Sequence, residues 1–133
     1  MAKKTTHDIT GKPKILVVED DSFLAGMYLT KFGIEGFDVE LASDGKDGLK
    51  KAKEWKPDLI LLDIVLPVVD GFTVLEKLRV DTEVRGIPVV LLTNLGQKSD
   101  VEKGLSLGAA DYLIKAHFMP SEVIEKVKRL LRP

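Results

Sequence analysis

Cysteine is absent from the 133-residue sequence. The chain therefore forms no disulfide and no thiolate metal site, and this absence fits a reducing compartment. A long apolar run is also missing, and the lysine-containing N-terminus has no apolar core segment, so we predict neither a membrane span nor a signal peptide. We therefore expect a cytoplasmic protein that has no membrane partner.

An excess of charge of either sign is missing too. The chain carries 20 Lys and Arg residues against 21 Asp and Glu residues, which gives a formal net charge of -1. This balance provides no general attraction to nucleic acid, so we expect no nucleic-acid partner. The length fits one domain, since a chain of this size can bury about two-thirds of its unfolded surface.

The sequence does contain a series of strand patterns that alternate with helix patterns. The central strand is 59–62, a run of four aliphatic residues that ends abruptly at Asp63. Such a run is typical of a strand buried on both faces of a parallel sheet. Further strands are predicted at 14–18, 37–42, 87–92 and 111–114. The alternation of polar and apolar residues in 37–42 favours an edge position.

Helical periodicity fills the intervals between these strands. We predict helices that begin at Asp21 or Ser22 and end near Gly33 and Gly36, that span 47–53, that follow Asp70-Gly71, that span 99–107, and that start at Pro120. The first helix should turn Leu24, Met27, Tyr28 and Phe32 inward, and the last helix Val123, Ile124, Val127, Leu130 and Leu131.

These patterns define one folded domain at 14–132. The preceding residues are polar and interrupted by Gly11 and Pro13, so we predict a flexible tail at 1–13. Five strand–helix units joined by right-handed crossovers predict an α/β fold, a doubly wound five-stranded parallel sheet with helices on both faces.

Polar side chains follow four of the five predicted strands. They are Glu19-Asp20, Asp63, Thr93 and Lys115. Strand ends at this edge of an open parallel sheet border one crevice, so the side chains should converge there. Taken singly, the acids or Thr93 could cap a turn or helix, and Lys115 could be a solvated charge. Their equivalent positions favour a functional site.

The sequence resembles the receiver domain of two-component response regulators. The resemblance covers residues 14–132 and rests on the four strand-end positions together with Pro67, Asp70-Gly71 and Tyr112, which precedes Lys115 by three residues. It implies the flavodoxin-like strand order 2-1-3-4-5. It also implies a chemotaxis-type protein, either a stand-alone receiver or a fragment of a longer chain.

The resemblance implies a phosphorelay function. Asp63 would take a phosphoryl group from the phosphohistidine of a sensor histidine kinase or phosphotransfer protein. The chain would be a signalling protein and not an enzyme in the usual sense, catalysing only its own phosphorylation and slow dephosphorylation. Phe23 and Leu29, which lie off the inward stripe of the first helix, would leave an apolar surface for such a partner.

The resemblance also implies Mg²⁺ as cofactor, an ion that prefers oxygen ligands. Its protein ligands would be the carboxylates of Asp20 and Asp63 and the backbone carbonyl of Val65, with Glu19 acting through water. Lys115 and the Thr93 hydroxyl would each contact a phosphoryl oxygen.

Tyr112 would be the switch residue. In the family, movement of the residue at Thr93 is coupled to rotation of the aromatic at this position. This rotation alters the face formed by helix 99–107, strand 111–114 and the last helix. An unidentified output protein would recognise that face.

Three features depart from the family pattern. Ala116 stands where proline usually follows the lysine, and Asn94 is larger than the small residue common there. Val65 and Leu95 are apolar, so neither can position an attacking water, and we expect a long-lived aspartyl phosphate.

Other functions fit less well. A phosphatase of the haloacid dehalogenase type would need an Asp in place of Val65, and a nucleotide binder would need a Ser/Thr/Gly-rich loop where three acids follow the first strand. The main alternative is a degenerate receiver that acts as a phosphorylation-independent interaction module.

Overall fold

The computed structural model describes residues 11–132. Residues 1–10 of the predicted tail lie outside this range, so the flexibility of the tail remains a prediction. The strands are β1 (Lys14–Val18), β2 (Asp38–Ala42), β3 (Leu59–Leu62), β4 (Val89–Thr93) and β5 (Asp111–Ile114). The helices are α2 (Ser22–Ile34), α3 (Gly45–Trp55), α4 (Gly71–Val80), α5 (Lys98–Ser106) and α6 (Pro120–Leu131), with a short 3-10 helix η2 (Lys115–His117).

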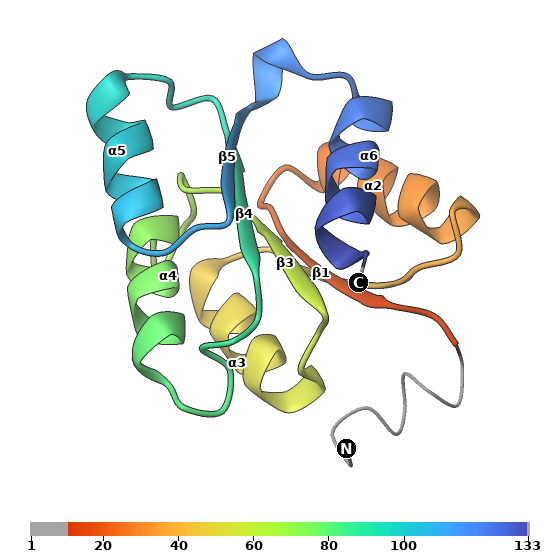
Figure 1. Ribbon diagram of the computed structural model, residues 1–133, viewed down its shortest axis with the longest axis horizontal. Coiled ribbons are helices and arrows are strands. Elements are labelled where there is room, and N and C mark those ends of the chain that lie inside the picture. The colour runs from red at the N-terminus through yellow and green to blue at the C-terminus, as the bar shows by residue number, and fades with distance from the viewer. Residues whose placement is uncertain (1–10, 133) are drawn as a thin grey trace.

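The five strands form one parallel sheet in the order β2-β1-β3-β4-β5. Helices α2 and α6 cover one face and α3, α4 and α5 cover the other (Figure 1). This arrangement confirms the predicted fold, and β2 lies at an edge as its alternating pattern indicated. None of the helices in the described range is both long and apolar enough to cross a membrane.

Two apolar cores attach the helices to the sheet, because successive side chains of each strand point to opposite faces. Under α2 and α6, Ile15 and Val17 of β1 meet Phe32 and Val127. Under the other three helices, Leu16 and Val18 of the same strand meet side chains such as Ala52, Val74 and Leu75. The strands buried on both faces are therefore the aliphatic runs seen in the sequence.

Several local predictions were wrong. The strand predicted at 87–92 is β4 at Val89–Thr93, so Thr93 is the last residue of the strand and does not follow it. Helix α3 begins at Gly45 and not at 47, because Asp44 is its N-cap and its Oδ1 accepts a hydrogen bond from the Asp47 backbone N at 2.7 Å. Leu130 is 41% exposed and does not face inward. Leu131 takes the inward position four residues after Val127, which leaves Leu130 about 100° away on the flank of the helix.

The loop between β3 and α4 is held by two glycines. A Cβ on Gly71 would lie 2.2 Å from the backbone O of Asp63, and a Cβ on Gly45 would lie 1.8 Å from the backbone O of Val69. No side chain fits at either position. The loop that follows Asp63 is therefore fixed against the start of α4 and the start of α3.

Within this loop, Val68 has a φ angle of 71°. This left-handed conformation costs a non-glycine residue roughly 1–2 kcal/mol and is rare for β-branched side chains. Val68 is also 72% exposed, so little burial offsets the strain.

We expect Val68→Asn to raise the free energy of unfolding by about 1 kcal/mol, because asparagine tolerates the left-handed region. Urea denaturation would measure the change. Val65→Asn is the matched control, since Val65 is an exposed valine of the same loop without a positive φ. Equal effects of the two substitutions would contradict an origin in backbone strain.

Candidate functional site

The carboxyl ends of β1, β3, β4 and β5 border an open crevice of about 420 Å³. The predicted site residues line it, together with neighbours from the same loops. They are Glu19, Asp20, Asp21, Asp63, Val65, Thr93, Asn94, Leu95 and Lys115. The structure therefore brings together every residue that sequence reasoning placed in the phosphoryl and metal site.

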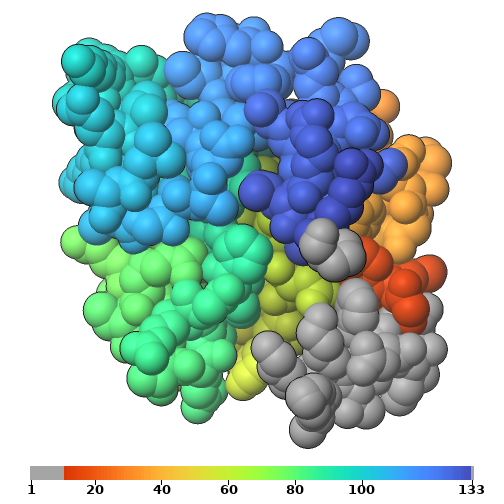
Figure 2. Space-filling view, in the orientation of Figure 1, coloured from red at the N-terminus to blue at the C-terminus, as the bar shows by residue number. Residues whose placement is uncertain are grey.

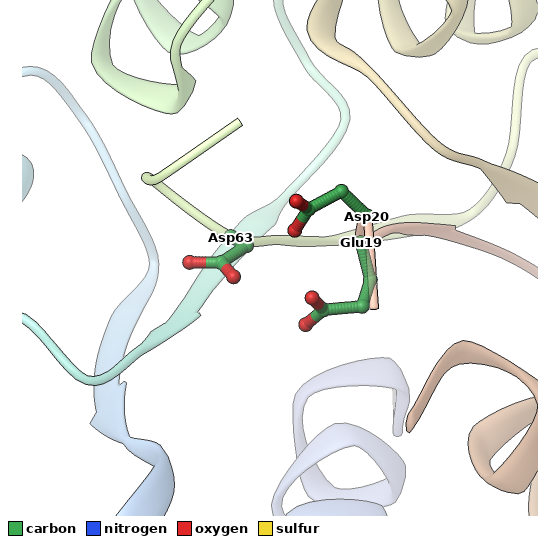
Figure 3. Close-up of side chains that lie close together, drawn as sticks. All are labelled: Glu19, Asp20 and Asp63. Atoms are coloured by element: carbon green, nitrogen blue, oxygen red, sulfur yellow. The ribbon is translucent and has the colours of Figure 1, made fainter. Parts of the chain in front are cut away.

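Three carboxyl groups form the acidic part of the crevice. Glu19 and Asp20 follow β1 and Asp63 follows β3, and each offers an oxygen within 4.8 Å of the others (Figure 3). Glu19 and Asp63 are buried, whereas Asp20 is exposed. The cluster thus combines two sheltered carboxyl groups with one that solvent reaches.

Lys115 connects two of these carboxyl groups. Its Nζ lies 2.7 Å from Oδ2 of Asp63 and 2.7 Å from Oε1 of Glu19. Burial lowers the pKa of Lys115, but the hydrogen bonds to Asp63 and Glu19 outweigh this effect and the pKa is raised overall. Lys115 therefore remains a charged ammonium that faces the carboxyl groups.

Burial has the opposite consequence for Glu19. It raises the pKa of this carboxyl group, and the hydrogen bonds from Lys115 and from the backbone N of Asp21 offset only part of the effect. The proximity of Asp63 raises the pKa further. Glu19 thus holds its negative charge at an energetic cost, and a nearby cation relieves that cost.

The Asp63 side chain is oriented by its own loop. Its Oδ1 accepts hydrogen bonds from the backbone N of Ile64 at 2.6 Å and of Val65 at 3.3 Å. Its Oδ2 accepts from Lys115. Both oxygens therefore have fixed donors at the end of the buried strand β3.

Thr93 and Tyr112 are linked through the backbone of Leu95. The Leu95 N donates to the Thr93 Oγ1 at 3.3 Å, and the Tyr112 hydroxyl donates to the Leu95 O at 2.6 Å. Burial raises the pKa of Tyr112 to about 12, so the hydroxyl remains a donor at neutral pH. Sequence reasoning missed this role of Leu95, because a backbone group leaves no signature in the sequence.

The capping interpretation holds in part. Glu19, Asp63 and Thr93 each accept a hydrogen bond from the backbone N of the residue two positions on, as the cap of a turn does. Asp21 is the N-cap of α2 and its side chain accepts from the backbone N of Phe23 and Leu24. Thr93 caps no helix, since the N-cap of α5 is Gln97. The side chain of Lys115 is 18% exposed and paired, so it is not a solvated charge.

Two of the residues that depart from the family pattern, Ala116 and Asn94, lie beside the site. No peptide bond within residues 11–132 is cis, so Lys115 joins Ala116 through a trans bond at the start of η2. The lysine nevertheless reaches Asp63. Asn94 is exposed at the margin of the crevice.

The donor set suits a divalent cation. Three carboxyl groups meet in this crevice, and Lys115 pairs with only two of them, Glu19 and Asp63. All of their ligand atoms are oxygens, which Mg²⁺ prefers over nitrogen or sulfur. Receiver domains in general bind Mg²⁺ at such an acidic pocket. The residues present therefore fit this ion.

Comparison with known proteins agrees with the fold and the site. Residues 15–128 match the response regulator receiver domain family. RpaA of Synechocystis, described as a DNA-binding dual master transcriptional regulator, is 43% identical over 120 residues, which are 90% of this chain and 49% of RpaA. The receiver domain of the Francisella response regulator 1452 superposes with a TM-score of 0.82 at 35% identity, covering 90% of this chain and 96% of that one.

The chemotaxis response regulator CheY4 of Vibrio cholerae superposes with a TM-score of 0.83 at 28% identity, covering 90% of this chain and 99% of CheY4. The chain spans about half the length of the curated relatives it matches. The chemotaxis type and the single-domain organisation are therefore not confirmed. The expectation of no nucleic-acid partner is not supported either, since relatives are named DNA-binding regulators.

The strand order, the acidic cluster and the family match over residues 15–128 lead to one conclusion. The chain belongs to the response regulator receiver domain family.

Proposed function

We propose that the chain is a phosphoacceptor, with residues 14–132 as its receiver domain, which takes a phosphoryl group on Asp63 from a histidine kinase or phosphotransfer protein. One observation carries this proposal. The Asp63 carboxyl group lies at the edge of an open crevice, beside an acidic pair and a half-buried lysine whose Nζ donates a hydrogen bond to Asp63 Oδ2 at 2.7 Å. A nucleophile, a cation site and a phosphoryl partner thus meet at one place.

The transfer involves one bond formed and one broken. An Asp63 carboxylate oxygen forms a bond to phosphorus, and the bond between phosphorus and the donor's imidazole nitrogen breaks. The electron pair returns to that nitrogen, and the ring exchanges protons with solvent to reach its neutral form. Asp63 then carries an acyl phosphate, and the donor histidine is regenerated.

The chain's own residues would guide this transfer. Lys115 already contacts Asp63 and would pair with a phosphoryl oxygen, and the Thr93 hydroxyl would contact another. Asp20, Asp63 and the Val65 carbonyl would hold Mg²⁺ directly, with Glu19 acting through water. The ion, when bound, supplies positive charge that offsets the repulsion between the carboxylates and the phosphoryl oxygens.

The surface that an output protein would recognise is continuous. The segment from α5 through β5 and η2 to α6 covers adjoining parts of the molecule (Figure 2). Tyr112 of β5 is bonded to the loop that precedes α5. We propose that an unidentified output protein binds this face.

The phosphodonor would bind near the start of α2. Phe23 is 84% exposed and Leu29 41% exposed, as expected from their positions off the inward stripe. The interaction module without phosphorylation is not favoured, because Glu19, Asp63, Thr93 and Lys115 all converge on the crevice.

Intact mass after incubation with acetyl phosphate and Mg²⁺ tests the proposal. We expect the mass of one phosphoryl group to be gained by the full chain and not by Asp63→Asn. Excess EDTA should prevent the gain in the unaltered chain. Absence of any gain, also with a histidine kinase panel as donor, would sink the phosphoacceptor function and favour the interaction module.

A further inference from the structure

Gly104 of α5 has no room for a side chain. A Cβ at this position would lie 2.6 Å from the Leu91 Cδ1, and 2.9 Å and 3.1 Å from the ring carbons Cδ2 and Cε2 of Tyr112. The first two separations are shorter than real Cβ contacts. The missing side chain therefore forms the slot in which one edge of the Tyr112 ring lies.

The two neighbours of Gly104 differ in their freedom to move. Leu91 is fully buried in β4 and belongs to the core beneath α4, so the surrounding packing holds it in place. Tyr112 is only half-buried and lies at the surface of β5. A side chain added at Gly104 would therefore displace the tyrosine ring more readily than the leucine.

Two hydrogen bonds link the Tyr112 ring to Thr93 in the crevice. The Tyr112 hydroxyl donates to the Leu95 O at 2.6 Å, and the Leu95 N donates to the Thr93 Oγ1 at 3.3 Å. If the ring leaves its slot, the first bond is lost. The loop that carries Leu95 then loses its tie to β5, and the Thr93 hydroxyl loses its fixed neighbour.

We propose that Gly104 is a positioning residue. It holds Tyr112 in its inward position and, through the Leu95 backbone, sets the orientation of the Thr93 hydroxyl before any phosphoryl group arrives. The link to phosphoryl transfer rests on the proposed function, whereas the placement of the ring does not.

Fluorine NMR tests the placement of the ring in the unphosphorylated full chain. Only two tyrosines are present in the sequence, Tyr28 and Tyr112, so a protein labelled with 3-fluorotyrosine gives two signals, which Tyr28→Phe assigns. We expect Gly104→Ala to shift the Tyr112 signal toward that of solvent-exposed fluorotyrosine and to leave the Tyr28 signal in place. An unchanged Tyr112 signal would overturn the proposal.

Gly26→Ala is the matched control. Gly26 also lies inside a helix, α2, but nothing lies within 4 Å of a Cβ built there. Alanine is the better helix former, so Gly26→Ala should raise the denaturation midpoint and leave the Tyr112 signal unchanged. Gly104→Ala should lower the midpoint despite the same gain in propensity. A rise in both midpoints would overturn the proposal.

A second variant covers the case in which Gly104→Ala does not fold. Adding Tyr112→Ala removes one of the two side chains that the new Cβ meets, so Gly104→Ala should cost less stability in a Tyr112→Ala background than in the unaltered chain. If the cost is the same in both backgrounds, the clash does not involve Tyr112 and the proposal fails.

The rate of mass gain with acetyl phosphate and Mg²⁺ tests the effect on Thr93. Gly104→Ala and Tyr112→Phe should each slow phosphorylation roughly fivefold, as expected for the loss of one hydrogen bond, and the combined variant should be no slower. Additive losses would overturn the link through Tyr112. No mass gain in the unaltered chain would instead contradict the proposed function, and the NMR result would stand by itself.

Discussion

Lys115→Met is expected to lower the free energy of unfolding by about 3 kcal/mol at neutral pH, because it removes one partner from a buried ion pair. The side chains of Glu19 and Asp63 are 5% and 7% exposed, and both lose their ammonium partner. Little solvent can replace it. Urea denaturation without added divalent cation would measure the change.

The loss should depend on pH, and its sign follows from Glu19. Burial already raises the pKa of Glu19 above its ordinary value of 4.5, and Lys115 counteracts this rise. Without Lys115 the pKa in the folded state rises further. A carboxyl group whose pKa is higher in the folded state than in the unfolded state stabilises the folded protein at a pH below the unfolded-state pKa. This contribution is lost as the pH rises through the folded-state pKa. The loss in free energy of unfolding caused by Lys115→Met should therefore be largest at about pH 8 and become smaller toward about pH 5.

Lys128→Met is the matched control for this prediction. Lys128 pairs with Glu35 at 2.8 Å, but the side chains are 33% and 40% exposed. Solvent screens this pair, so we expect a much smaller loss than for Lys115→Met, with little change between the two pH values. Equal losses for the two lysine variants would show that burial of Glu19 and Asp63 does not make their ion pairs with Lys115 more stabilising than an exposed pair.

The aspartyl phosphate of the unaltered chain should be long-lived, and Val65→Gln should shorten its lifetime roughly tenfold, since one hydrogen bond to an attacking water lowers the barrier by about 1.4 kcal/mol. Val65 and Leu95 line the crevice and offer no side-chain hydrogen bond to water. An amide at position 65 can orient a water toward phosphorus. Decay of the phosphorylated mass after removal of the phosphodonor would measure both lifetimes.

Val68→Gln is the control for the lifetime. Val68 is exposed in the same loop but is not among the residues that line the crevice. Its substitution adds the same amide without placing it at phosphorus, so the lifetime should not change. Rapid loss of phosphate from the unaltered chain, or the same acceleration in both variants, would contradict the water-exclusion explanation.

The sequence alone was sufficient to place the five strands and to predict which strand-end side chains meet in the crevice. The run 59–62 was predicted with the bounds that β3 has, because four aliphatic residues in a row require burial on both faces. Asp63, Thr93 and Lys115 were predicted to converge, because the carboxyl ends of parallel strands share one edge. Both inferences use information that lies within a few residues of the chain.

The contacts within the site were decided by the tertiary structure. Lys115 and Asp63 are separated by 52 positions, and their bond depends on the order of β3, β4 and β5 in the sheet. No local pattern indicates that one lysine serves two carboxyl groups. The pKa directions of Glu19 and Lys115 follow from that geometry and from burial.

The special roles of Gly104 and Val68 could not be predicted from local sequence patterns either. In the sequence, Gly104 only weakens a helix pattern and Val68 is an unremarkable apolar loop residue. The structure shows that Gly104 leaves space for a ring from β5 and that Val68 adopts a φ of 71°. The sequence by itself indicated where the five strands lie and which side chains meet at their carboxyl ends, since periodicity and burial are local properties. Only the tertiary structure decided how closely the elements approach, because that distance is set by packing between segments far apart in the chain.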